Sequence, residues 1–259
     1  MEILPEDSSA KDLFFRALSR GTLEVVKAVV SLGANVNWRQ DTKFGLSGLQ
    51  IAVVRRSLEM LEFLLSKGAD VNVVDKAGQT PLMAACGIGQ PAMVEKLCQV
   101  PGILLNSRDI QGNTALMIAL ATNHIQCVEK LRAVTGVDWN ALNKDGLSTI
   151  MLAVILGYVG VVEALLPVSS LDLKIKTSDG NSLAHFAVDS DKVNSQRILQ
   201  LLCQDERVDW NTEDPEGKRP VLLALELNKV EMFRSLVRTP GVETNITDSE
   251  GRSLEQLVM

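Results

Sequence analysis

The fold is decided by the stretch Asp75-Lys76-Ala77-Gly78-Gln79-Thr80-Pro81-Leu82-Met83-Ala84-Ala85-Cys86, because variants of it recur along the chain. Its glycine returns at intervals of 33, 34, 34, 34, 37 and 34 residues, and the series is Gly45, Gly78, Gly112, Gly146, Gly180, Gly217 and Gly251. A fixed period of roughly 20–50 residues is typical of proteins in which one supersecondary unit is stacked many times. The sequence therefore predicts a repeat architecture with a long surface rather than a deep pocket.

Each glycine is followed by residues typical of a helix start. A hydroxyl residue, able to cap the first turn, comes two positions later at Ser47, Thr80, Thr114, Ser148, Ser182 and Ser253. An alanine, small enough for close helix contact, comes seven positions later at Ala52, Ala85, Ala119, Ala153, Ala187 and Ala224. A second apolar run follows with the spacing of a helix face, as in Leu61, Leu64 and Leu65. Each repeat therefore reads as helix, tight turn, helix and loop.

The loops carry a second periodic pattern. An asparagine lies six residues before most of the glycines, at Asn72, Asn106, Asn140, Asn211 and Asn245; Lys174 replaces it once, and Asn37 is displaced by an insertion. Aspartates form a further set in the hairpins: Asp41, Asp75, Asp109, Asp214 and Asp248. Short polar side chains can satisfy the backbone groups of turns. We expect them to bond hairpin to hairpin along the stack.

These motifs resemble ankyrin repeats, whose pattern D-x-x-G-x-T-P-L-H-x-A is matched at Asp75–Ala85 except for Met83 in the histidine position, and whose G-A-x-V-N ending is matched at Gly68–Asn72. The resemblance implies an all-α solenoid of about seven helix–turn–helix repeats joined by hairpin loops. We expect residues 1–10 to be a poorly ordered tail and 11–259 to be a single domain. Its repeats are predicted at about 11–41, 42–74, 75–108, 109–142, 143–176, 177–213 and 214–247, with a half repeat at 248–259. The extra residues after Gly180 predict a longer turn around 189–192.

Composition excludes several classes of function. The net charge is −6, and no run of Lys or Arg exceeds two residues, which argues against nucleic acid and favours a neutral or basic protein partner. No apolar run reaches the roughly 18 residues of a membrane span, and the acidic N-terminus lacks a signal-peptide core. The cysteines lack Cys-x-x-Cys spacing; they are Cys86, Cys98, Cys127 and Cys203. We expect buried, reduced thiols and a location in the cytoplasm or nucleus.

No constellation of residues predicts catalysis. The only two histidines, His124 and His185, fall in register positions where the ring is expected to bond backbone groups. Neither has a partner at triad or metal spacing, and Gly87-Ile88-Gly89 lacks the context of a phosphate loop. We therefore expect no enzyme activity, cofactor, metal or small-molecule substrate. A small-ligand receptor would need an aromatic-lined pocket, for which Trp38 and Phe44 are the only candidates.

The resemblance implies that protein partners bind at the hairpin tips and on the concave face of the first helices. Carried onto this chain, and with the inserted loop around Trp38 added, the candidate protein-binding residues are Trp38, Phe44, Leu46, Val54, Ile110, Asn113, Lys144, Leu147 and Ile155. Several are apolar where a bare scaffold would be polar, and such patches often mark an interface. The face is expected to become acidic toward its C-terminal end. Trp139 and Trp210 share one register slot and are expected to pack at the base of their hairpins.

The sequence thus predicts a non-enzymatic protein–protein interaction scaffold. A second interpretation remains open, namely an adaptor or regulatory part of a larger multidomain protein or enzyme complex. It is motivated by the last repeat, which stops after one helix at Met259.

Overall fold

The computed structural model describes residues 8–247, 251–254 and 256. Within them the chain forms fourteen α-helices in seven pairs, with no β-strand beyond isolated bridges at the hairpins. The pairs are α1 (Ser8–Arg20) with α2 (Leu23–Ser31), α3 (Gly48–Val54) with α4 (Leu58–Ser66), α5 (Pro81–Gly87) with α6 (Pro91–Cys98), α7 (Ala115–Ala121) with α8 (Ile125–Arg132), α9 (Thr149–Leu156) with α10 (Val159–Leu165), α11 (Leu183–Asp189) with α12 (Ser195–Leu202), and α13 (Pro220–Glu226) with α14 (Val230–Val237). The predicted fold class, an all-α stack of helix pairs, is confirmed.

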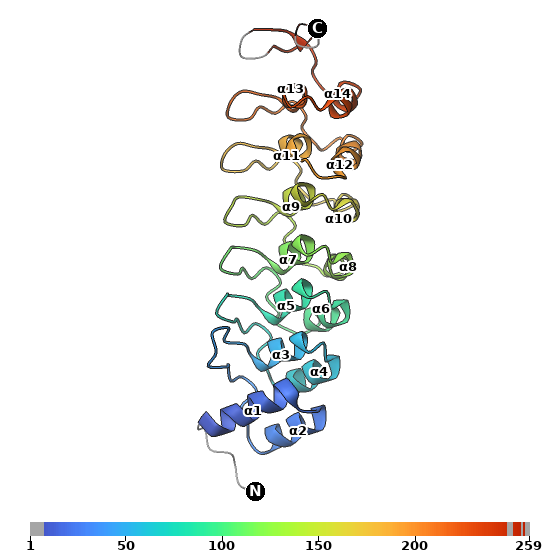
Figure 1. Ribbon diagram of the computed structural model, residues 1–259. Coiled ribbons are helices and arrows are strands. Elements are labelled where there is room, and N and C mark those ends of the chain that lie inside the picture. The colour runs from blue at the N-terminus through green and yellow to red at the C-terminus, as the bar shows by residue number, and fades with distance from the viewer. Residues whose placement is uncertain (1–7, 248–250, 255, 257–259) are drawn as a thin grey trace. The chain divides into compact units, whose positions relative to one another are not determined.

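The chain divides into two compact parts between Asp138 and Trp139, and each part is described by itself. The N-terminal part holds α1 to α8, and the C-terminal part holds α9 to α14. Within each part, first helices contact first helices and second helices contact second helices of the next repeat, as α5 does with α7 and α12 with α14 (Figure 1).

The helices begin where the periodic hydroxyl residues stand. The side-chain oxygens of Ser47, Thr80, Thr114 and Ser148 accept hydrogen bonds from backbone N–H groups three residues later, at 3.2 to 3.4 Å. The six periodic alanines are at most 1% exposed, so they are the close-contact positions that the pattern predicts.

The asparagines link successive loops within each part, as predicted. Asn72 shows the arrangement: its Nδ2 donates to the Gly102 carbonyl and its Oδ1 accepts from the Leu104 N–H, both at 2.8 Å. The same pair of bonds is made by Asn37, Asn106, Asn140 and Asn211.

The hairpin aspartates work locally. Asp75 Oδ1 accepts from two N–H groups of its own turn, and Asp109 and Asp214 do the same. Asp41 was wrongly assigned to this set: it forms an ion pair with Lys11 of α1 at 2.7 Å, because the insertion moves it out of register. Asp248 lies outside the described residues.

Where Lys174 interrupts the asparagine series, Arg207 supplies a different link. Its guanidinium donates to the carbonyls of Val168 and Leu166 at 3.0 and 2.6 Å. Asp205 holds it in place through a 2.6 Å ion pair. The hydrogen bond from Arg207 lowers the pKa of the Asp205 carboxyl. The loops at this step are therefore joined by a long charged side chain instead of an asparagine.

The structure bears on three expected segments: the N-terminal tail, the longer turn and the half repeat. Helix α1 begins at Ser8 and buries Ala10, so residues 8–10 do not belong to a poorly ordered tail; residues 1–7 lie outside the described part of the chain. The turn between α11 and α12 spans 190–194, against 88–90 between α5 and α6, so the longer turn is confirmed. Of the expected half repeat, the described residues include Leu254, which is 6% exposed.

Candidate protein-binding surface

Three hairpin tips of the N-terminal part are tied together through their backbones. Lys76 N–H donates to the Phe44 carbonyl, and Ile110 N–H donates to the Ala77 carbonyl, both at 3.0 Å. Two apolar side chains stand exposed on this row: Phe44 is 58% and Ile110 is 53% exposed. The Lys43 ammonium lies 4.8 Å from the centre of the Phe44 ring. The tips therefore present exposed apolar groups on a fixed backbone.

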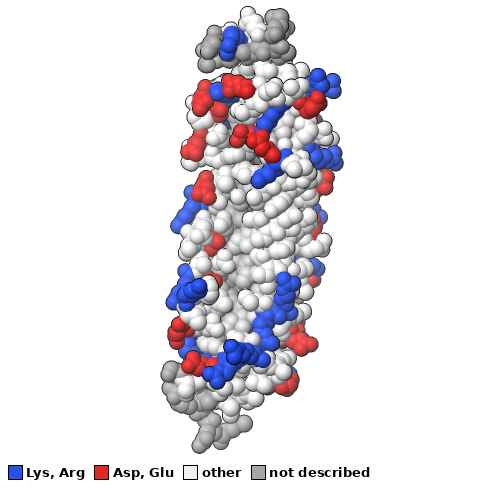
Figure 2. Space-filling model, in the orientation of Figure 1, with Lys and Arg blue, Asp and Glu red and all other residues white. Residues whose placement is uncertain are grey.

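The first helices beside these tips carry no charge. Neither α5 nor α7 contains a charged residue, and the stretches 77–94 and 110–128 lack Asp, Glu, Lys and Arg altogether. Figure 2 shows few charged atoms over this part of the visible face. Ile88 and Ile118 are half-buried there, so the surface of α5, α7 and the turns that follow them is largely uncharged.

The other N-terminal candidates differ in exposure. Val54 is 58% exposed at the end of α3, whereas Leu46 and Asn113 are half-buried. The Asn113 N–H donates to Asp109 Oδ1 at 2.8 Å, which fixes the backbone at this tip.

Trp38 lies differently from a free loop aromatic. Its ring packs edge-on against Phe14 of α1, with centroids 6.0 Å apart, and the residue is half-buried. One side of the indole therefore packs on α1. Trp38 has less accessible surface for a ligand than the exposed ring of Phe44.

In the C-terminal part, Lys144 is exposed at its hairpin tip, while Leu147 and Ile155 are half-buried. The Leu147 N–H is fixed by Asn143 Oδ1 at 3.0 Å. Helix α9 is uncharged, as is the whole stretch 146–162. Leu147 and Ile155 are therefore partly covered before any partner binds.

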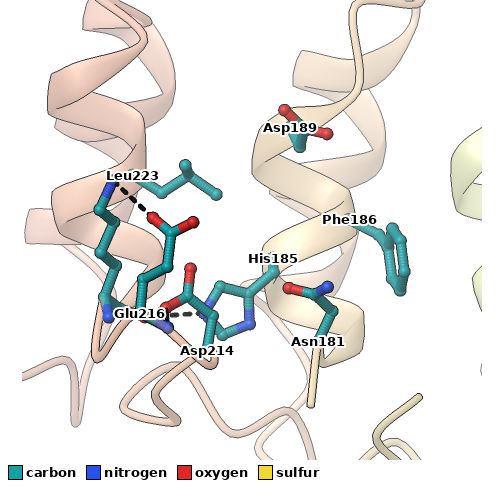
Figure 3. Close-up of a pocket in the computed structure, with 8 residues that line it drawn as sticks. Asn181, His185, Phe186, Asp189, Asp214, Glu216 and Leu223 are labelled. Atoms are coloured by element: carbon teal, nitrogen blue, oxygen red, sulfur yellow. Dashed lines mark hydrogen bonds and ion pairs between the residues drawn. The ribbon is translucent and has the colours of Figure 1, made fainter. Parts of the chain in front are cut away.

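A pocket of about 230 Å³ opens between α11 and α13. Three acidic residues and one lysine carry charge in its lining, which is Asn181, His185, Phe186, Asp189, Asp214, Glu216, Lys218 and Leu223. Figure 3 shows the Asp214 carboxylate facing the His185 ring, with Phe186 turned away from it. Lys218 Nζ is held between Glu226 at 2.7 Å and Glu216 at 3.1 Å, and the hydrogen bonds to these carboxylates raise the pKa of Lys218.

This pocket was not among the candidate sites. The signal for it was the presence of acidic residues at a helix end and a hairpin tip of neighbouring repeats, namely Asp189 and Glu216. Because each repeat contributes only one or two of these residues, no single motif marks the pocket in the sequence.

Both histidines bond backbone groups, as predicted. His185 is 3% exposed, and its Nε2 lies 3.0 Å from the Lys218 carbonyl while its Nδ1 lies 2.8 Å from Ser182 Oγ. This pattern assigns the proton to Nε2, so that Nδ1 accepts from the hydroxyl. Burial lowers the pKa of His185 and keeps the ring neutral. His124 Nδ1 lies 2.9 Å from the Cys86 carbonyl, and a Cβ on Gly89 would approach the ring to 2.6 Å.

The remaining singled-out residues have structural environments. Trp139 and Trp210 are 9% and 5% exposed, which confirms their expected packing. The cysteines are free; two are buried, two are half-buried, and burial raises the pKa of all four thiols. Across residues 8–247, 251–254 and 256, no cluster of His, Cys, Asp or Glu could hold a metal ion. No helix in the same residues is long and apolar enough to cross a bilayer.

Comparison with known proteins identifies the class. The family of ankyrin repeats in three copies matches residues 67–141 and 150–248, and a single ankyrin repeat matches residues 44–76. The chain therefore belongs to the ankyrin-repeat family, whose domains generally bind other proteins.

Curated relatives are similar over parts of their length. The probable 26S proteasome regulatory subunit p28 of Saccharomyces cerevisiae is 33% identical over 103 residues, which are 40% of this chain and 45% of that protein. Human protein phosphatase 1 regulatory subunit 27 is 34% identical over 85 residues, which are 33% of this chain and 54% of that protein. The chain thus matches about half the length of these relatives.

Among solved structures, the ankyrin repeat domain of Bcl-3, a member of the IkappaB protein family, is similar with a TM-score of 0.78 at 23% identity. The match covers 90% of this chain and 100% of that one. At this identity the likeness shows the fold alone.

Proposed function

We propose that this protein is a non-enzymatic scaffold that binds a neutral or basic protein partner through its hairpin tips and the exposed face of its first helices. The observation that carries the proposal is the row of tips in the N-terminal part, where Phe44 and Ile110 are both more than half exposed on backbones joined by hydrogen bonds. A preformed surface of this kind loses little conformational entropy on binding. Large exposed apolar side chains on rigid backbone are also typical of interface anchors.

The candidate residues contribute unequally within each part. In the N-terminal part, Phe44, Val54 and Ile110 are exposed to a partner, and Leu46 and Asn113 are half-buried neighbours. In the C-terminal part, Lys144 is exposed, and Leu147 and Ile155 are half-buried. Trp38 contributes through the side of its ring that Phe14 leaves open. The acidic pocket between α11 and α13 favours a basic side chain on the partner. Cofactors, metals, nucleic acid, membranes and small-molecule substrates have no part in the proposal.

A regulatory role within a larger assembly is the second candidate function. It is favoured by the similarity to two proteins named as regulatory subunits, of the proteasome and of protein phosphatase 1. In either case the array acts by holding proteins together. Four free, mostly protonated thiols agree with the reducing cytoplasm or nucleus as its location.

The test compares proteins captured from a cell extract by four forms of the chain: wild type, Phe44→Asp, Ile110→Asp and Val193→Asp. Val193 is fully exposed on the α11–α12 turn and serves as the matched control. We expect the two tip variants to lose the same protein that wild type and the control retain. A captured set that is identical for all four forms would overturn the proposed surface.

A further inference from the structure

The second helix of the last complete pair has an apolar side that no described helix covers. On α14, Val230 is 48% and Val237 is 44% exposed, and Phe233 between them is half-buried. These residues follow the i, i+3, i+7 spacing of one helix face. Val230 and Phe233 line a groove of about 350 Å³ together with Ala224, Leu225, Asn228, Lys229 and Arg234.

The other second helices show what covers this side of a repeat. In the N-terminal part α4 is covered by α6, and in the C-terminal part α10 is covered by α12. The residues in the register position of Phe233 are Leu61, Val94, Val162 and Leu199, and all are 0% exposed. Phe233 is therefore the one residue of this set that is not fully buried. A helix packed along α14 would bury it.

Charge specifies the kind of helix. In three of the five contacts between successive second helices, the earlier helix offers a glutamate and the later one a base: Glu62 with Lys96 at 2.9 Å, Glu95 with Lys130 at 2.6 Å, and Glu163 with Arg197 at 3.6 Å. Between α12 and α14 the link is instead a hydrogen bond from Gln196 Nε2 to Ser235 Oγ at 3.0 Å. On α14 the register position of these glutamates holds Arg234. Arg234 is well exposed and pairs only with Glu231 of its own helix, at 2.8 Å, among its recorded ion pairs.

From this reversal we infer that the exposed side of α14 is a second docking surface, which binds an amphipathic helix carrying an acidic side chain opposite Arg234. A helix like α6 or α8 would bring a lysine against Arg234 and be repelled. An acidic helix would form an ion pair with Arg234, in which α14 supplies the base and the docked helix supplies the acid. The apolar stripe of that helix would cover Val230, Phe233 and Val237. This surface is separate from the proposed hairpin-tip surface and does not depend on it.

The test uses the full chain and two labelled, alanine-based helical peptides of about 18 residues, long enough to hold a helix in water. The peptides share a leucine stripe and differ only in one residue, Glu or Lys, placed to face Arg234. Fluorescence anisotropy gives their affinities, and amide exchange locates the binding. We expect the Glu peptide to bind at least about threefold more tightly and to protect α13 and α14 from exchange.

Two variants sharpen the outcome, and both lie at exposed positions, where substitutions rarely affect folding. Arg234→Glu should reverse the preference so that the Lys peptide binds more tightly. Val230→Asp should weaken both peptides, whereas Leu104→Asp, a change at a 59% exposed residue of the N-terminal part, should not.

Several results would overturn the inference. One is equal affinity for the two peptides, or no binding to wild type. Another is a dimer in sedimentation that Val230→Asp dissolves, which would assign the face to a second copy of the chain. A third is faster exchange of residues 251–256 in Val230→Asp without peptide, which would show that the chain's own C-terminal segment already occupies the groove.

Discussion

The imidazole of His185 in α11 donates its Nε2 proton to the carbonyl oxygen of Lys218, 3.0 Å away in the hairpin of the next repeat. Nδ1 lies 2.8 Å from Ser182 Oγ, and only the neutral ring can accept this hydrogen bond, whereas the Nε2 donor is present in both protonation states. Burial is the main reason that the pKa of His185 lies below its usual value, and it outweighs the opposite effect of the Lys218 carbonyl and of Asp214. The hydrogen bond from Ser182, at the start of α11, therefore depends on the protonation state of His185.

The first prediction is a pH effect on stability. An unfolded histidine has a pKa of about 6.5, so below that pH the unfolded chain takes up a proton that folded His185 resists. The contribution of His185 is complete above about pH 6.5 and is lost as pH falls through the lower folded pKa. Amide exchange in α11 and α13 should be faster at pH 5 than at pH 7, after correction for intrinsic rates.

The control for this effect is His185→Gln, which offers an amide donor to the same carbonyl and does not titrate. Its difference in protection between pH 5 and pH 7 should be smaller than that of wild type. An equal difference in the two proteins would assign the acid sensitivity to the carboxylates instead.

The second prediction concerns the periodic alanines. Ala119 and Ala153 are fully buried, so leucine at either site has no room. Overpacking of this kind costs typically about 1–3 kcal/mol, and we expect Ala119→Leu and Ala153→Leu to lower the free energy of unfolding by that amount in urea titrations. Ala121→Leu, at an exposed site on α7, should change it little. If all three variants unfold at the same urea concentration, the alanines are not close-contact positions.

The third prediction tests the asparagine links. Asn72→Ala removes two hydrogen bonds to the next loop, each worth about 0.5–1.5 kcal/mol. We expect a loss of about 1–2 kcal/mol and faster exchange of the Leu104 amide. Lys174→Ala changes the same register position where the side chain is exposed, and it should be neutral. Equal effects of the two substitutions would mean that the links do not stabilise the stack.

The sequence was informative wherever the structure repeats. Helix starts at Thr80 or Ser148 and the buried Ala119 follow from local chemistry that is copied in every repeat, so periodicity alone predicts them. The loop links of Asn72 were predicted for the same reason.

Residues that depart from the period could not be placed. The contact of Trp38 with Phe14 depends on how the inserted loop returns to α1, and Arg207 replaces an asparagine link from another position in its loop. The partial burial of Leu147 and of Phe233 depends on which neighbours are present. These features depend on tertiary contacts between segments that are distant in sequence, so no local sequence pattern predicts them.

We propose above all that the hairpin tips of the N-terminal part bind a protein. The most direct measurement is the affinity, by titration calorimetry, of wild type, Ile110→Asp and Val193→Asp for the protein captured by wild type, with thermal melting of each form alongside. Because Ile110 is 53% exposed, its substitution should leave melting unchanged. An interface anchor replaced by a charge should weaken binding about tenfold or more, whereas Val193→Asp should bind like wild type. Wild-type affinity in a folded Ile110→Asp variant would contradict the claim.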